Sequence, residues 1–234
     1  MAKGKKAAAF ALLTGPPIAV AVASRVAGGA SWRVALSCGA LSSFAFCDMW
    51  YFLRMAKLTV SSALLPAPPR RELFEPSELP GRITLADIDR NAHCNNARFL
   101  RECGFGRRDL WECNGVWEIV VGAGGNLIVG AQSVRYRREL TFGEAYTLET
   151  RVLCWDDRAF YVEHRFCTQS AGGKFVHAVV VVKNVVLGSL RPAQIVEKLL
   201  QREVESPAMP ADVTAWIQSN NISSKALRAE ASKL

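Results

Sequence analysis

Residues 89–96, DRNAHCNN, place an acid, a histidine and three asparagines directly before a segment with helical periodicity. Asp89, Asn91 and His93 occupy positions i, i+2 and i+4, so an extended backbone would point their side chains to one side. A carboxylate, an amide and an imidazole that converge in this way could carry thioester hydrolysis. The acid could activate water or attack the carbonyl, and the imidazole or the amide could hold the water or the thioester oxygen.

The start of the following helix could supply a site for the developing oxyanion. Asn95 and Asn96 stand just before the helical segment, where a side-chain oxygen can accept from an N–H group of the first turn. Free N–H groups near Cys94, Asn95 and Asn96, aided by the positive end of the helix, could stabilise negative charge on a reacting carbonyl. Capping accounts for at most the two adjacent asparagines and leaves the acid, the first asparagine and the histidine unexplained.

The surrounding pattern predicts an α+β domain. Residues 82–88 alternate like a strand, and 95–112 are typical of an amphipathic helix that Gly104 and Gly106 could bend or shorten. Residues 117–121 could add a short strand. Four longer β-branched or aromatic segments follow: NLIVGAQSVRYRRE, AYTLETRVLCWDD, RAFYVEHRFCTQ and KFVHAVVVVKNVVLG. One strand, one long helix and then four or five antiparallel strands predict a curled sheet wrapped around a single helix.

The first part of the chain has the composition of a membrane anchor. Residues 34–53 are apolar for about one bilayer-crossing helix, roughly 20 residues, and end in aromatic residues followed by Arg54 and Lys57. We therefore expect a transmembrane anchor at 34–57; the alternative is a buried helix of the folded domain. Residues 1–33, basic and free of acids, could be a targeting segment or a first span. This start favours a mitochondrial membrane.

Composition divides the rest of the chain into three parts. Residues 58–80 hold five prolines, and we expect them to form a semi-rigid linker. Residues 81–190 would form the folded domain. Residues 191–234 would form a helical tail, with helices at 192–201 and 210–219 that each have a proline near the start, where its missing N–H is harmless.

Charge and cysteine usage argue against several classes of partner. Residues 1–47 carry five of the eight net positive charges, so the folded part shows a weak nucleic-acid footprint and we expect no nucleic acid partner. The seven cysteines form no C-x-x-C pair, which fits neither a disulfide framework nor a zinc site. His164 and His177 fall within strand patterns without ligand spacing around them, so we expect no metal site.

The segment DIDRNAHCNNARFL resembles the D-x-D-x-x-x-H-x-N-N-A-x-[YF]-L segment at the strand-to-helix junction of the hotdog-fold thioesterase superfamily. Four further stretches are similar to a smaller, membrane-associated branch of that superfamily: FCDMWYFLRM, PGRITLADID, CWDDRAFYVEHRF and LLQREVESPAMPADVTAWI. The resemblance covers about residues 44–220. It implies a hotdog fold, paired with a second hotdog domain edge to edge, and the branch implies the endoplasmic reticulum membrane as the alternative location.

The resemblance also implies roles for individual residues. Asp89 matches the nucleophile or general base of some members, and a D-x-N-x-H set of others falls on Asp89, Asn91 and His93. A Y-R-R-E-C stretch falls on residues 136–140 and would make Glu139 complete the polar set. The substrate would be an acyl thioester of coenzyme A or acyl carrier protein, with no metal or redox cofactor.

Two arginines and two departures from the family pattern leave alternatives open. Arg137 or Arg138 could meet the phosphates of coenzyme A or of a carrier's pantetheine arm, or form a solvated edge or dimer face. Ala92 stands where a glycine is frequent, and Leu140 replaces the cysteine after the glutamate.

Taken together, the sequence and the resemblance predict a membrane-anchored, dimeric hotdog thioesterase. The alternative is a catalytically inactive hotdog subunit with a structural or acyl-binding role in a membrane protein complex.

Overall fold

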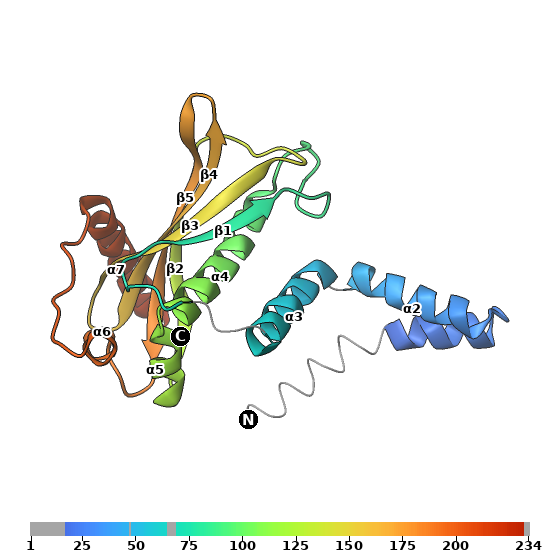
Figure 1. Ribbon diagram of the computed structural model, residues 1–234, viewed down its shortest axis with the longest axis horizontal. Helices are drawn as coiled ribbons and strands as arrows, with labels where there is room; N and C mark the ends of the chain where they lie inside the picture. The colour runs from blue at the N-terminus through green and yellow to red at the C-terminus, as the bar shows by residue number, and fades with distance from the viewer. Residues whose placement is uncertain (1–16, 47, 65–68, 232–234) are drawn as a thin grey trace. The chain divides into compact units, whose positions relative to one another are not determined.

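The structure, a computed structural model, describes residues 17–46, 48–64 and 69–231. The chain divides into two compact units, 1–67 and 68–234. The described part of the first unit is helical (Figure 1) and consists of helix Pro17–Val26, α2 (Trp32–Phe46) and α3 (Met49–Leu64).

The apolar stretch predicted as one helix at 34–53 is two helices. α2 and α3 are bent 99° apart, so the stretch is not one continuous helix, and the anchor expected at 34–57 stays a prediction. Asp48 explains the start of α3, because its Oδ1 accepts a hydrogen bond from the N–H of Tyr51 at 3.3 Å and so caps the helix. Among the described residues, no single helix has the length and apolar composition to cross a bilayer. α2 and α3 have that length and composition only when they are taken together as a bent pair.

The second unit contains a five-stranded antiparallel sheet in the order β1-β3-β4-β5-β2, with helix α4 packed on one face (Figure 1). This arrangement confirms the predicted α+β hotdog fold. We call the face toward α4 the inner face and the opposite face the outer face. The elements are β1 (Ser77–Arg82), α4 (Asn96–Cys113), α5 (Val116–Gly122), β2 (Asn126–Tyr136), β3 (Ala145–Trp155), β4 (Ala159–Ser170), β5 (Gly173–Leu187), α6 (Pro192–Leu200) and α7 (Ala211–Ala231).

Helix α4 lies unusually close to the sheet at Gly106. A Cβ atom there would stand 2.4 Å from Thr150 Oγ1, so glycine permits the approach and the helix runs on unbroken. His164 of β4, next to Gly106, is fully buried, and its Nε2 lies 3.5 Å from Arg107 Nη1. Because an arginine only donates, His164 Nδ1 carries the hydrogen and donates to Thr150 Oγ1 at 2.9 Å. Burial, then the charge of Arg107, lowers the pKa of His164 well below its ordinary value, so the ring is neutral.

Helix α7 covers part of the outer face. A bulge in β3 after Val152 turns Cys154 outward, where it joins Tyr161 and Val213 in a separate apolar cluster. Because α4 covers the inner face and α7 covers part of the outer face, β4 is buried on both faces. The helix predicted at 210–219 therefore exists but continues to Ala231.

Three element predictions differ from the structure. The first strand, Ser77–Arg82, begins inside the predicted linker 58–80, and residues 83–88 turn instead of continuing it. An edge strand tolerates Pro80, one of the five prolines on which the expected linker rested. Residues 117–121 are helical, because Gly115 at φ 81° redirects the chain after α4 and Val116 and Val120, four apart, are both buried.

Candidate functional site

Residues 89–93 form a tight turn instead of the predicted extended segment. The N–H of Asp89 donates to the carbonyl of His93, and the N–H of Ala92 donates to the carbonyl of Asp89, both at 3.0 Å. Asp89 Oδ1 accepts from the N–H of Asn91 at 2.9 Å. Ala92 has a φ of 63°, the left-handed conformation that the frequent glycine at this position would adopt more easily. The prediction that three side chains share one side of an extended chain is therefore wrong.

The turn nevertheless brings the predicted acid and imidazole together. His93 Nδ1 lies 3.8 Å from Asp89 Oδ1, and the two side chains are 29% and 24% exposed. Asn91 is exposed at the tip of the turn, and its backbone, not its side chain, contacts Asp89. The structure thus assembles two of the three residues from this segment into a polar pair that solvent reaches.

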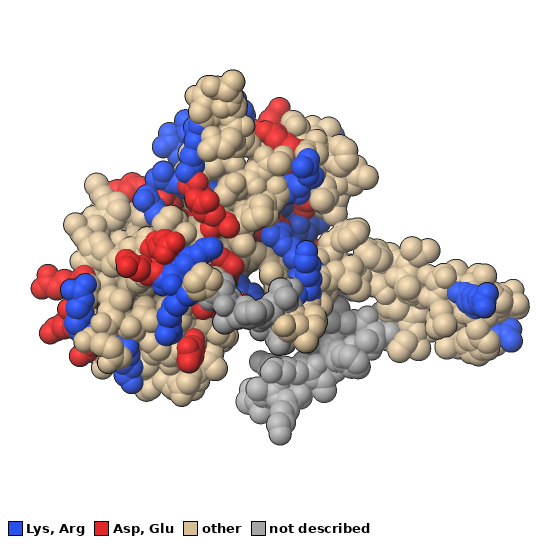
Figure 2. Space-filling view, viewed as in Figure 1, with Lys and Arg blue, Asp and Glu red and all other residues tan. Residues whose placement is uncertain are grey.

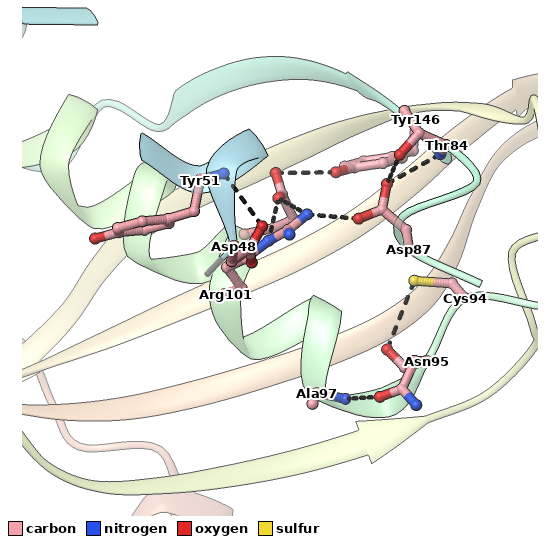
Figure 3. Close-up of polar contacts among 10 residues, drawn as sticks. Asp48, Tyr51, Thr84, Asp87, Cys94, Asn95, Ala97, Arg101 and Tyr146 are labelled. Atoms are coloured by element: carbon pink, nitrogen blue, oxygen red, sulfur yellow. Dashed lines mark hydrogen bonds and ion pairs between the residues drawn. The ribbon is translucent and has the colours of Figure 1, made fainter. Parts of the chain in front are cut away.

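Most of the amides proposed for the oxyanion are occupied. The N–H of Cys94 donates to the carbonyl of Leu140, and the N–H of Asn95 donates to the carbonyl of Asp87, both at 2.8 Å. Asn95 also caps α4, as predicted, by accepting from the N–H of Ala97 at 2.9 Å (Figure 3). Within the part of the chain that the structure describes, the N–H of Asn96 alone among the amides of residues 94–97 donates no hydrogen bond. The prediction that the amides of Cys94 and Asn95 are free is therefore wrong, because both donate to backbone carbonyls.

The thiol of Cys94 is also unsuited to chemistry. Its side chain is buried, and burial, followed by the charges of Asp87 and Glu102, raises its pKa to about 12. The thiol therefore stays protonated near neutral pH. It serves as a small apolar side chain of the core cluster that includes Phe99.

A buried charged network holds the turn against α4 (Figure 3). Asp87 Oδ2 accepts from the N–H and the hydroxyl of Thr84 at 2.9 and 2.6 Å, and its Oδ1 pairs with Arg101 of α4. Arg101 also contacts Glu102 at 3.2 Å, and Glu102 accepts from the hydroxyl of Tyr146 of β3 at 3.3 Å. Sequence reasoning missed this network. Two features of the sequence could have indicated it. One is Asp87, the first acid of the D-x-D motif, and the other is the charged pair Arg101 and Glu102 on the otherwise apolar face of the helix.

Glu139 and Arg138 lie at a different cavity. This cavity of about 540 Å³ is lined in part by Arg138, Glu139 and His177 and does not include Asp89 or His93. The carbonyl of Glu139 accepts from His177 Nδ1 at 3.0 Å, and its side chain is exposed. The prediction that Glu139 completes the polar set at Asp89 is not supported by any contact among the described residues. β2 ends at Tyr136, so Glu139 lies beyond the strand.

Arg137 and Arg138 are both exposed beside one aromatic ring. Their guanidinium carbons lie 5.2 and 4.2 Å from the ring centre of Phe175, and Arg137 Nη1 donates to the carbonyl of Val176 at 3.0 Å. Cation–π contact holds both cations at the surface. Their expected role toward phosphates stays a prediction.

The Asp89–His93 pair can support proton transfer. A carboxylate that keeps one oxygen outside fixed hydrogen bonds can accept a proton from water, and an adjacent imidazole can orient that water. Within the part that the structure describes, no group of three or more histidine, cysteine, aspartate or glutamate side chains could hold a metal ion.

Comparison with protein families matches residues 83–217 to the model described as Thioesterase-like superfamily. Protein THEM6 of Danio rerio is 39% identical over 193 residues, which cover 82% of this chain and 93% of that protein. Protein THEM6 of Drosophila melanogaster is 31% identical over 201 residues, which cover 85% and 98%. These relatives confirm the narrower resemblance to the smaller branch.

Solved structures of thioesterases are similar over about half of the chain. The probable thioesterase YbaW of Escherichia coli has a TM-score of 0.45 at 17% identity and covers 55% of this chain and 98% of its own. The 4-hydroxybenzoyl CoA thioesterase of Pseudomonas sp. strain CBS-3 has a TM-score of 0.43 at 16% identity and covers 52% and 97%.

Replacing Arg101 tests the buried network. Arg101→Met removes the guanidinium that faces Asp87 and Glu102, both nearly buried, and should lower the free energy of unfolding by roughly 3–5 kcal/mol. Arg108→Met, on the same helix, removes a more exposed pair with Glu112 and should cost about 1 kcal/mol or less. Urea unfolding followed by circular dichroism measures both. Equal losses in the two variants would show that the network does not hold the turn.

Proposed function

The chain belongs to the thioesterase-like superfamily, and from this premise we propose that it hydrolyses acyl thioesters of coenzyme A or acyl carrier protein at the Asp89–His93 pair. The observation that carries the proposal is the approach of His93 Nδ1 to Asp89 Oδ1 at 3.8 Å in a turn that solvent reaches. The turn lies directly before α4. The N–H groups of the first helical turn point toward this N-terminal end of the helix.

In the proposed reaction, water attacks the thioester carbonyl while Asp89 accepts its proton. His93 orients the water, and the N–H of Asn96 with the positive end of α4 stabilises the oxyanion. Collapse of the tetrahedral intermediate breaks the carbon–sulfur bond, and the departing thiolate takes the proton back from Asp89. The products are a carboxylic acid and a free thiol. Arg137 and Arg138, held at the surface by Phe175, are the proposed contacts for the phosphates of the carrier.

One observation favours a second candidate, an acyl-binding subunit without hydrolysis. Two of the amides first expected for the oxyanion are used by the fold, since Cys94 and Asn95 donate to Leu140 and Asp87. A site with few oxyanion donors loses much of the usual electrostatic stabilisation. Such a subunit would bind acyl thioesters and leave them intact.

We place the proposed enzyme at a membrane through its first unit. Large apolar side chains are exposed along helix Pro17–Val26, α2 and α3, among them Val26, Trp32, Leu41 and Leu64. In Figure 2, charged atoms are sparse over the described surface of this unit. Exposed apolar patches of this extent mark a membrane or a protein interface.

We also propose that β2 pairs with a second copy of the chain. β2 is an edge strand of 11 residues, and Ile128 and Val129 are 41% and 40% exposed. A long, apolar edge has backbone groups ready to pair with another strand, and proteins usually cover such edges. Antiparallel pairing of two β2 strands would join the two sheets into one.

Asp89→Asn tests the catalytic proposal. The amide has the same shape and can keep the contact with the N–H of Asn91, but it cannot accept a proton, so kcat should fall by about a hundredfold or more. Thiol release from a panel of acyl-CoA and acyl carrier protein thioesters measures the rate. Asp157→Asn in the exposed hairpin turn is the matched control and should behave as the wild type. Unchanged turnover in Asp89→Asn would refute the assignment, and binding without turnover in the wild type would favour the second candidate.

Alkaline carbonate extraction tests the membrane proposal. The full chain should stay in the membrane pellet, because its first unit exposes apolar surface that lipid can bury. Replacing Leu36, Leu41 and Phe44 of α2 together by Asn should move the chain toward the supernatant. Recovery of the unmodified chain in the supernatant would contradict the proposal.

Val129→Lys tests pairing through β2. A lysine on a strand edge disfavours pairing with another strand, so the variant should sediment at half the mass of the wild type in the same mild detergent. Leu187→Lys is a suitable control, because Leu187 is also exposed but lies on β5, an interior strand. A wild-type chain that sediments as a monomer would contradict the proposal.

A further inference from the structure

A second cavity lies on the outer face of the sheet, between α7 and strands β2 and β5. Its volume is about 370 Å³, within the range of small-molecule sites, roughly 300–1,000 Å³. Val179 and Val181 of β5 form its floor, and their neighbour Val180 faces α4 in the inner core. None of Asp89, His93 and Glu139 lines it. The cavity is therefore separate from the proposed catalytic pair.

Two apolar side chains of α7, Val213 and Trp216, form one wall of the cavity. Val213 is buried, and Trp216 closes one side of the cavity. The indole makes an edge contact with the ring of Tyr161 at 6.4 Å, and the hydroxyl of Tyr161 donates to Asp156 at 2.6 Å. Because these contacts hold the indole, a ligand would meet a wall that is already formed.

The cavity has one cation that the fold leaves without a partner. Glu163 lies 2.9 Å from Arg151 and 2.7 Å from Arg165, so its charge is compensated. Asp212 stands in the first turn of α7, where the positive end of the helix favours an acid. Arg135 of β2 is exposed and makes no side-chain hydrogen bond or ion pair within residues 17–46, 48–64 and 69–231. A guanidinium in this setting favours a carboxylate.

We propose that this outer cavity binds a small amphiphile with one carboxylate, whose charged head pairs with Arg135 and whose hydrocarbon chain lies between the two floor valines and Trp216. Burial of the chain supplies most of the affinity, and the charge-assisted contact selects anions over neutral or cationic amphiphiles. Side chains stand perpendicular to a sheet, so pairing of the β2 edge leaves Arg135 on the outer face. The proposal does not require that the chain hydrolyse thioesters.

Equilibrium dialysis of radiolabelled octanoate against the full chain in lipid nanodiscs tests the site, with empty nanodiscs as the blank. Octanoate should bind at one saturable site per chain, and unlabelled octanol and octyltrimethylammonium should compete at least tenfold more weakly. Arg135→Met should weaken octanoate binding tenfold or more, because a hydrogen bond to a charged group is lost. Arg138→Met is the matched control, since this exposed arginine lines the other cavity, and it should bind octanoate as the wild type does.

Two further variants locate the ligand. Val179→Trp fills the floor of the cavity and should abolish binding, with circular dichroism to verify the fold. Asp89→Asn should bind octanoate unchanged; loss of binding there would place the ligand at the catalytic pair and overturn the proposal. Equal affinity in Arg135→Met and wild type, equal competition by octanol, or no saturable binding would each overturn it as well.

Discussion

The candidate site depends on the buried ion pair between Asp87 and Arg101. Buried charges persist only where partners compensate them, and here Thr84, Arg101, Glu102 and Tyr146 do so together. These residues come from the turn before the site, from α4 and from β3. Their contacts therefore fix the turn, the helix and the sheet relative to one another. Without this network, the turn at 89–93 would be attached mainly by its β-bridges.

A second constraint acts along α4, where the helix approaches the sheet. Gly106 permits contact with Thr150, and His164 beneath it stays neutral because burial and Arg107 disfavour its charged form. The helix is thus held by polar contacts near its middle as well as by the apolar residues around them. The start of α4, with its one uncommitted amide at Asn96, is positioned by both sets of contacts.

The sequence predicted what depends on local periodicity and missed what depends on particular side-chain and turn contacts, whether near or far along the chain. The four long strands and α4 follow from alternation and helical spacing, and Asn95 was correctly expected as a cap. The pairing of Asp87 with Arg101 joins residues 14 apart and leaves no periodic signal. The start of α3 at Asp48 was missed because it lies within an apolar stretch. The mean hydropathy of about 20 residues changes little when one of them is a capping aspartate. The turn at 89–93 was missed because a D-x-N-x-H spacing fits a turn as well as a strand.

Among the acidic groups around the turn, Asp89 is the best candidate for the base of the proposed reaction. Both oxygens of Asp87 are engaged, one by Thr84 and one by Arg101. Glu102 is likewise engaged by Arg101 and Tyr146, and the thiol of Cys94 is held protonated by burial. Within the part of the chain that the structure describes, Asp89 Oδ2 makes no hydrogen bond or ion pair, while Oδ1 is fixed by the N–H of Asn91. A carboxylate with one oxygen anchored and one available is the arrangement that general-base catalysis requires.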